Sequence, residues 1–183
     1  MPKSMLLLLL FCFYGCKNEK VEVLSFKEQQ IYEYIQKYRF AAKAELTKNG
    51  IPISIKLAQG ILESKSGRSE LARKANNHFG IKCGKNWKSG SYTIISDEWD
   101  RKKGRMIARK GCFRAYTTVD ECYNAHSNML KHKRYKKLFE LDYRDYKNWA
   151  LGLQKLGYAT DPDYAKKVII IIERYRLYEL DRD

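Results

Sequence analysis

The sequence lacks the patterns of a metal centre, a membrane-spanning helix or a repeat protein. Its five cysteines and three histidines form no Cys-x-x-Cys pair and no Cys/His cluster with the spacing of zinc ligands. The apolar run Met5–Tyr14 has ten residues, about half of the roughly 20 that a helix needs to cross a bilayer. No internal repeat and no low-complexity stretch is present. We therefore expect no metal ion, no organic cofactor and one folded domain.

Acidic residues are scarce relative to basic ones. The 183-residue chain has 36 Lys and Arg against 21 Asp and Glu, which gives a formal charge of +15. A charge of this sign favours a polyanionic partner, which could be nucleic acid, anionic lipid or an acidic cell-wall polymer. The hydrophobic share of 44% is that of a globular protein.

The N-terminal residues narrow the choice among these polyanionic partners. A short basic start, Met1-Pro-Lys3, precedes the apolar run, and together they have the form of a secretory signal peptide. Gly15-Cys16 resembles a bacterial lipoprotein cleavage site, although Phe13-Tyr14 departs from the usual leucine and small residue. We expect residues 1–15 to be a lipoprotein signal peptide, 16–27 a tether and 28–183 the domain. Cys16 would carry the lipid and anchor the exported protein to the membrane, facing the periplasm or cell surface, so nucleic acid is not an expected partner.

The remaining chain is mainly helical. Residues 26–49 keep an apolar spacing of three to four and end at a glycine. Strand-like segments at 92–95 and 106–108, on either side of a turn at 100–104, predict a β-hairpin. Helical patterns resume after residue 118. This order predicts helices with one small β lobe.

The helix that follows Gly50 carries the main functional candidate, Glu63. Ser54 is the expected N-cap and Ser66-Gly67 the expected stop. Glu63 lies opposite the apolar face, so it is either a solvated surface residue or an acid that lines a substrate site. Its place in the last turn favours the second interpretation, because the helix dipole there raises a carboxyl pKa, as a general acid requires. Gly60 would leave a gap on the same face for a ligand.

Three motifs occur in order: Leu57-Ala-Gln-Gly-Ile-Leu-Glu-Ser64, Asn76-Asn-His-Phe-Gly-Ile-Lys82 and Gly157-Tyr-Ala-Thr-Asp-Pro-Asp-Tyr-Ala165. Together they resemble the glucosaminidase domains of glycoside hydrolase family 73, which are bacterial cell-wall hydrolases. The resemblance covers about residues 31–181. It implies an α+β, predominantly α, lysozyme-like fold with a small β-hairpin lobe. It also implies an endo-β-N-acetylglucosaminidase that cleaves the β-1,4 bond after N-acetylglucosamine in peptidoglycan glycan strands.

The resemblance also implies residue roles. Glu63 would be the general acid, and the second carboxylate would come from the β lobe, where Glu98 is the candidate and Asp97 the alternative. His126 stands where relatives commonly have an Asp-His pair, but Ala125 replaces the acid, so we expect a structural histidine. The predicted substrate-binding residues are Gln59, Asn76, Asn77, Phe79, Asp97 and Tyr158. For the asparagines the alternative is a turn held by their amides, and for Tyr158 it is plain packing.

The cysteines predict one disulfide. If Cys12 leaves with the signal peptide and Cys16 is acylated, three cysteines remain, which allows one pair and one free thiol. Cys83 lies at the entrance to the hairpin lobe and Cys112 at its exit, so the hairpin would bring them within bridging distance. Cys122 is a poorer partner because it lies inside a predicted helix.

Two other functions remain open at this point. A muramidase or lytic transglycosylase on the same fold would need only Glu63 and would break the other glycosidic bond. A basic wall-binding protein without catalysis would bind peptidoglycan and turn nothing over. In each case we expect a monomer.

Overall fold

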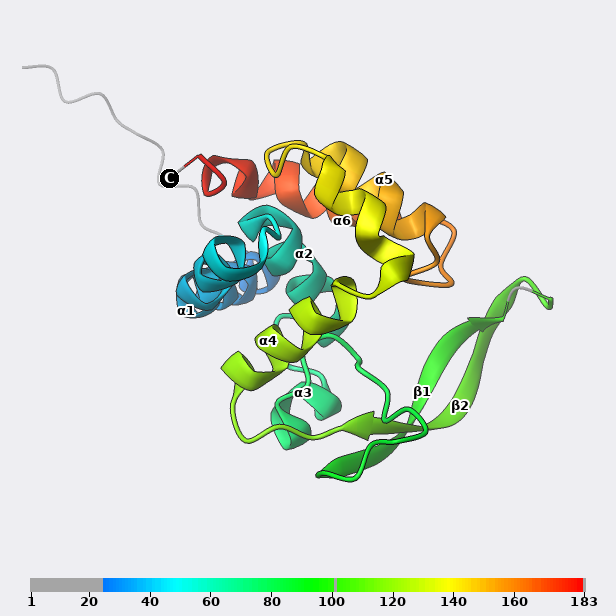
Figure 1. Cartoon of the computed structure of the whole chain (residues 1–183). Coiled ribbons are helices and arrows are strands. Elements are labelled where there is room, and N and C mark those ends of the chain that lie inside the picture. Colours follow the sequence, from blue (N-terminus) through cyan, green and yellow to red (C-terminus); the bar gives the residue numbers. More distant parts are fainter. Residues whose placement is uncertain (1–24, 101, 183) are drawn as a thin grey trace, which may run out of the picture.

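The computed structural model describes residues 25–100 and 102–182, without the side chains of Asp97 and Glu98. The expected signal peptide, Cys16 and most of the expected tether lie outside the described residues. Within the described ranges, no helix is long and apolar enough to cross a membrane. Figure 1 shows a body of helices from which one β-hairpin extends.

Helix α1 (Phe26–Asn49) begins and ends where its sequence signals predict. The Ser25 hydroxyl accepts the Glu28 N–H, and the Glu28 carboxylate accepts the Ser25 N–H, so two orphan donors of the first turn are satisfied. Gly50 ends the helix in the left-handed region, with φ of 69°, which glycine adopts without a steric cost. The domain start expected at residue 28 therefore lies inside the first turn of α1.

Helix α2 (Ile53–Ser64) is the centre of the helical body. Ten of its twelve residues are buried, and the two others are Leu62 and Glu63. The helix packs against α1, α5 and α6 and against the last 3₁₀ turn (Figure 1). The other helical elements are α3 (Glu70–Ala75), α4 (Val119–Leu130), the 3₁₀ helix η1 (Lys133–Glu140), α5 (Tyr146–Lys155), α6 (Tyr164–Arg174) and the 3₁₀ turn η2 (Leu177–Glu179).

Two expectations about α2 are wrong. Ser54 is not the N-cap, because the helix begins at Ile53 after Pro52; instead, the Ser54 N–H donates to the Asp181 carboxylate from the C-terminal segment, over 3.0 Å. Gly60 leaves no gap for a ligand. A Cβ at this position would overlap the Tyr34 hydroxyl of α1, so the missing side chain makes room for that tyrosine.

The β-hairpin consists of β1 (Ser91–Asp100) and β2 (Arg105–Arg114), paired antiparallel over their full lengths. The strands are longer than the predicted segments: β1 continues outward beyond Ile95 and β2 continues inward beyond Ala108, so that all ten residues of each strand pair. At the turn, Asp100 accepts the Gly104 N–H through its carbonyl, over 2.8 Å. At the base, Tyr92, Ile94 and Phe113 pack against α3. The predicted architecture, mainly α with a small β-hairpin lobe, is confirmed.

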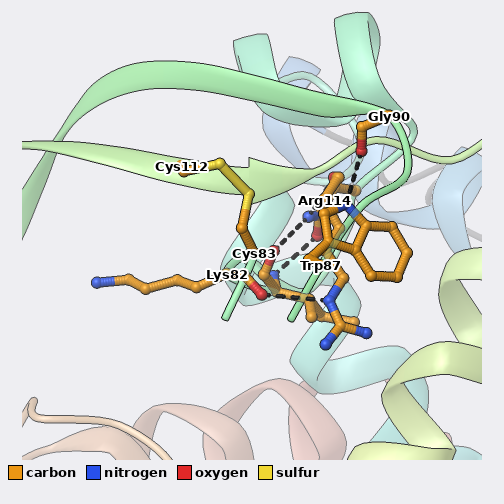
Figure 2. Close-up of a disulfide and its surroundings, with 8 residues drawn as sticks. Lys82, Cys83, Trp87, Gly90, Cys112 and Arg114 are labelled. Carbon is orange, nitrogen blue, oxygen red and sulfur yellow. Dashed lines mark hydrogen bonds between the residues drawn. A yellow bond between two sulfur atoms is a disulfide. The ribbon is translucent and has the colours of Figure 1, made fainter. Parts of the chain in front are cut away.

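The base of the hairpin is cross-linked to the loop before it. The structure joins Cys83 to Cys112, the pair expected from the sequence, with 5.5 Å between the Cα atoms (Figure 2). The Cys83 N–H also donates to the Cys112 carbonyl over 3.0 Å. Cys122 is a buried free thiol, as its place inside α4 predicts. The disulfide thus ties the start of the lobe to its end.

A second clamp lies beside the disulfide. The Arg114 guanidinium lies 4.3 Å from the centre of the Trp87 ring and donates to the Lys82 carbonyl over 3.2 Å. The Trp87 indole N–H in turn donates to the Gly90 carbonyl over 2.9 Å (Figure 2). A cation held over an aromatic face in this way adds a direction-dependent attraction to the backbone bonds.

Candidate active site

Glu63 stands at the end of α2, where the chain turns sharply. The helix ends at Ser64, two residues before the predicted stop, and Lys65, Ser66 and Gly67 follow with φ of 52°, 56° and 77°. Left-handed backbone is uncommon for residues other than glycine, and such residues cluster at functional sites. The Ser64 hydroxyl holds the turn by accepting the Gly67 N–H over 2.6 Å. The position of Glu63 is therefore set by a stiff helix end.

The surroundings of Glu63 suit a general acid. The residue is open to solvent, yet protein surrounds its carboxyl on most sides, so the group is accessible and poorly hydrated at once. This loss of hydration raises the pKa of Glu63 to about 7, with repulsion from Asp161 acting in the same direction. A hydrogen bond from Tyr164 opposes the rise. The predicted direction of the shift agrees, but its main cause is desolvation and not the helix dipole.

Two tyrosines lie beside Glu63. The Tyr164 hydroxyl accepts a hydrogen bond from the Gln59 amide over 2.8 Å and gives its own to Glu63. The Tyr158 ring lies 5.3 Å from the Tyr164 ring, centre to centre. Burial, together with the negative charge of Glu63, raises the pKa of both phenols well above the ordinary value. Both hydroxyls therefore remain protonated and able to donate.

Gln59 does not contact solvent. Its side chain is fully buried, which leaves no surface for the direct substrate contact predicted for it. Its amide instead holds the Tyr164 hydroxyl. The residue that does reach Glu63, Tyr164, was given no predicted role, because a tyrosine at helical spacing gives no sign that its hydroxyl lies in a site.

The two asparagines of the Asn-Asn-His-Phe-Gly motif bind backbone. The Asn76 amide donates to the carbonyls of Tyr116 and Thr117, each over 3.0 Å. The buried Asn77 amide donates to the carbonyls of Ile81 and Arg114, over 3.0 and 2.8 Å. These bonds occupy the amide protons that a sugar would need, so the alternative of a turn held by asparagine amides describes this loop.

Phe79 is also buried, which leaves no face for the predicted sugar subsite. Its ring stacks on the His126 ring, with 4.0 Å between centres and 12° between planes.

The β-lobe carboxylates occupy the outer half of β1. Glu98 pairs with Ile107 and Asp97 with Ala108 in the strand register. Their side chains lie outside the described part of the structure, so their roles remain predictions. Among the described residues, no group of three or more His, Cys, Asp or Glu side chains could hold a metal ion.

Comparison with known proteins identifies the family. The family model described as mannosyl-glycoprotein endo-beta-N-acetylglucosaminidase, named Glucosaminidase, matches residues 39–177. The chain belongs to this glucosaminidase family. It is 41% identical over 160 residues to the exo-glucosaminidase LytG of Bacillus subtilis (strain 168), covering 84% of this chain and 54% of that protein. It is 27% identical over 149 residues to the peptidoglycan hydrolase FlgJ of Salmonella typhimurium, covering 79% of this chain and 46% of that one. The chain thus spans about half the length of these two relatives.

Solved structures agree with the glucosaminidase fold. A mutant peptidoglycan hydrolase from Sphingomonas sp. A1 matches with a TM-score of 0.71 and 27% identity, covering 81% of this chain and 96% of that one. The catalytic domain of the autolysin Auto from Listeria monocytogenes matches with a TM-score of 0.70 and 27% identity, covering 87% and 99%. The lysozyme-like fold expected from the sequence is therefore confirmed.

The glucosaminidase domain also contains a buried polar chain that sequence reasoning missed. Lys56 of α2 is fully buried, and its amine lies 2.8 Å from Nδ1 of His126. Nε2 of His126 lies 2.9 Å from the Tyr158 hydroxyl. Burial lowers the pKa of Lys56 to about 7 and that of His126 well below its ordinary value. The only sign of this buried chain in the sequence was the position of Lys56 between two core residues, Ile55 and Leu57.

Proposed function

We propose that this chain is a peptidoglycan glucosaminidase that cleaves the β-1,4 bond after N-acetylglucosamine, with Glu63 as its general acid. The observation that carries the proposal is the state of Glu63: it is open to a ligand and has a pKa raised to about 7. An acid with this pKa holds its proton in part at neutral pH and can deliver it to a leaving group. Membership of the glucosaminidase family supports the choice of bond.

In the proposed mechanism, Glu63 protonates the leaving oxygen as positive charge develops at the anomeric carbon. Glu98, or the acetamido group of the substrate itself, then stabilises that charge or activates water. Asp97 is the alternative to Glu98. Tyr158 orients the acetamido group through its hydroxyl.

The experiment that tests this function is product analysis. Purified sacculi are digested, the products are reduced with borohydride, and the new reducing ends are identified. New reducing N-acetylglucosamine supports the proposal, whereas reducing N-acetylmuramic acid identifies a muramidase and an anhydro product a transglycosylase. Binding without new ends would identify a wall-binding protein. Fragments of mixed length indicate the proposed endo cleavage; small products of one size indicate cleavage from strand ends, as the name of the LytG relative suggests for that protein.

The pH dependence follows from Glu63. Because its pKa is raised to about 7, the acid form is present below that pH and is lost above it. We expect kcat/KM to fall about tenfold per pH unit above pH 7. Lys56 also has a pKa of about 7, so the pH profile of Lys56→Met is the control. If Glu63 causes the fall in kcat/KM above pH 7, the same fall is seen in Lys56→Met. A profile that is flat up to pH 9 would contradict the assignment.

The charge predicts how the protein holds its substrate. A chain of +15 should bind an anionic wall partly through screened electrostatics. We expect the fraction that sediments with purified sacculi to fall between low salt and about 0.5 M NaCl. Unchanged sedimentation over this range would show that recognition does not depend on charge.

We also propose that the protein is exported and lipid-anchored through Cys16, as a monomer. The support is the basic start, the ten-residue apolar run and Gly15-Cys16. In bacteria fed a labelled fatty acid, we expect label on the wild-type protein and none on Cys16→Ala. Equal labelling of both would remove the anchor from the proposal.

A further inference from the structure

We propose that Lys56 and His126 are positioning residues that orient the Tyr158 hydroxyl so that it donates toward Glu63 and the bound sugar. The inference rests on the proposed function, since it assigns a task to residues behind the candidate acid. His126 was expected to be structural, and Lys56 had no predicted role.

The three residues come from separate elements and meet in a line. Lys56 is in α2, His126 in α4 and Tyr158 in the turn after α5. The amine of Lys56 donates to the Tyr123 carbonyl over 2.8 Å and lies 2.8 Å from Nδ1 of His126. Nε2 of His126 lies 2.9 Å from the Tyr158 oxygen. Tyr158 is close enough to Glu63 for its charge to act on the phenol. A path of hydrogen bonds therefore leads from the core to the site.

The chemistry of the groups gives this path a direction. Burial keeps His126 neutral, so its ring carries one N–H and one acceptor. Where Lys56 donates to Nδ1, the proton of His126 is on Nε2 and is donated to the Tyr158 oxygen. The phenol proton is then free for the site. Without a donor at Nδ1, His126 could take the other tautomer, and the Tyr158 hydroxyl would turn inward to donate to Nε2.

No charged group near Lys56 competes with His126 for its protons. The acid that acts on it is Glu45 of α1, which accepts a hydrogen bond from Asn49. Cys122 and Tyr123 of α4 also face it, and burial raises the pKa of both above the ordinary values, which keeps them neutral. Among the described residues, Lys56 thus bonds no carboxylate and directs its protons to the Tyr123 carbonyl and to His126.

Two further observations support a positioning role. Phe79 lies flat against His126 and fixes the plane of the ring, and the Asn77 amide holds the loop that carries Phe79. The motif loop thereby acts on the site through His126. The second tyrosine is arranged in the same way, because Tyr164 accepts from the buried Gln59 and donates to Glu63. Each phenol beside Glu63 is therefore backed by a buried donor.

The test is a double-mutant cycle. His126→Phe keeps a ring against Phe79 but removes the N–H, and Tyr158→Phe removes the hydroxyl. We expect each to lower kcat/KM on sacculi about tenfold, which corresponds to the loss of about one hydrogen bond. Because His126 acts through Tyr158, the double variant should be no slower than Tyr158→Phe. His126→Gln, whose amide can donate in place of Nε2, should recover most of the activity.

Matched variants separate this role from folding. His132→Phe makes the same change at an exposed histidine outside this path and should stay within about twofold of wild type. Thermal unfolding shows whether His126→Phe is folded. If it is not, Lys56→Met and Lys56→Gln replace it, and we expect Lys56→Met to lose activity and Lys56→Gln to retain part of it. Multiplicative losses in the cycle, or full activity of both His126→Phe and Lys56→Met, would overturn the inference. If the inference is overturned in either way but Glu63→Gln is inactive, the proposed function still stands. If Glu63→Gln is active, the proposed function is refuted instead.

Discussion

Replacing Glu63 with glutamine should lower hydrolysis of peptidoglycan by about 10²–10⁴-fold, because the variant cannot donate the proton that the leaving oxygen requires. The fold should survive, since Gln has the same shape and Glu63 is not buried in the core. Release of soluble sugar from sacculi measures the effect. Glu140→Gln, which removes a charge from an exposed position at the end of η1, is the matched control and should retain full activity. Activity of Glu63→Gln within a few-fold of wild type would refute the mechanism.

At alkaline pH, Glu63→Gln should be more stable than the wild-type protein. The native pKa of Glu63 is raised from 4.5 to about 7, so the native state binds more protons between these values and its stability falls as pH rises through them. Glutamine carries no charge, so Glu63→Gln should unfold a few degrees higher than wild type at pH 9 and at about the same temperature at pH 4. Thermal unfolding at the two pH values checks this.

Two matched substitutions test which residue supplies the second carboxylate. Glu98→Gln should lower activity strongly and Asp97→Asn only slightly if Glu98 serves. The reverse order would assign the role to Asp97. Little effect from either change would favour the acetamido group of the substrate.

Removing the disulfide should have the largest effect on stability. Cys83 and Cys112 close a loop with a sequence separation of 29, and in the chain-entropy model such a link stabilises by about 3–4 kcal/mol. We expect the Cys83→Ala/Cys112→Ala protein to unfold at a markedly lower temperature. Activity should also fall, because the β lobe that carries Glu98 is tied down at this point. Calorimetry and sacculus digestion measure the two effects.

Reduction supplies the control for this prediction. Wild type in dithiothreitol should approach the unfolding temperature of the double variant, and the double variant itself should not respond to the reductant. The backbone bond between Cys83 and Cys112 and the clamp of Arg114 on Trp87 remain, so a folded hairpin is still expected. Equal unfolding temperatures for wild type and variant in the absence of reductant would contradict a stabilising role.

The sequence by itself determined the local structure and the family. The bounds of α1, the existence of α2, the hairpin and the cysteine pair follow from caps, periodicity and turn residues that act over a few positions. The motif around Glu63 identified the candidate acid, because a short motif on one helix needs no knowledge of the rest of the chain.

Tertiary structure alone decided what surrounds that acid. Tyr164 reaches Glu63 across 101 positions of the sequence, and Lys56, His126 and Tyr158 meet from three elements. No spacing rule encodes such contacts, since they depend on how the helices pack. Burial reversed the predictions for Gln59, Asn77 and Phe79 for the same reason: whether a polar or aromatic side chain meets a sugar or its own protein depends on what the neighbouring elements cover. The raised pKa of Glu63 likewise comes from the loss of water around it, which only the assembled fold produces.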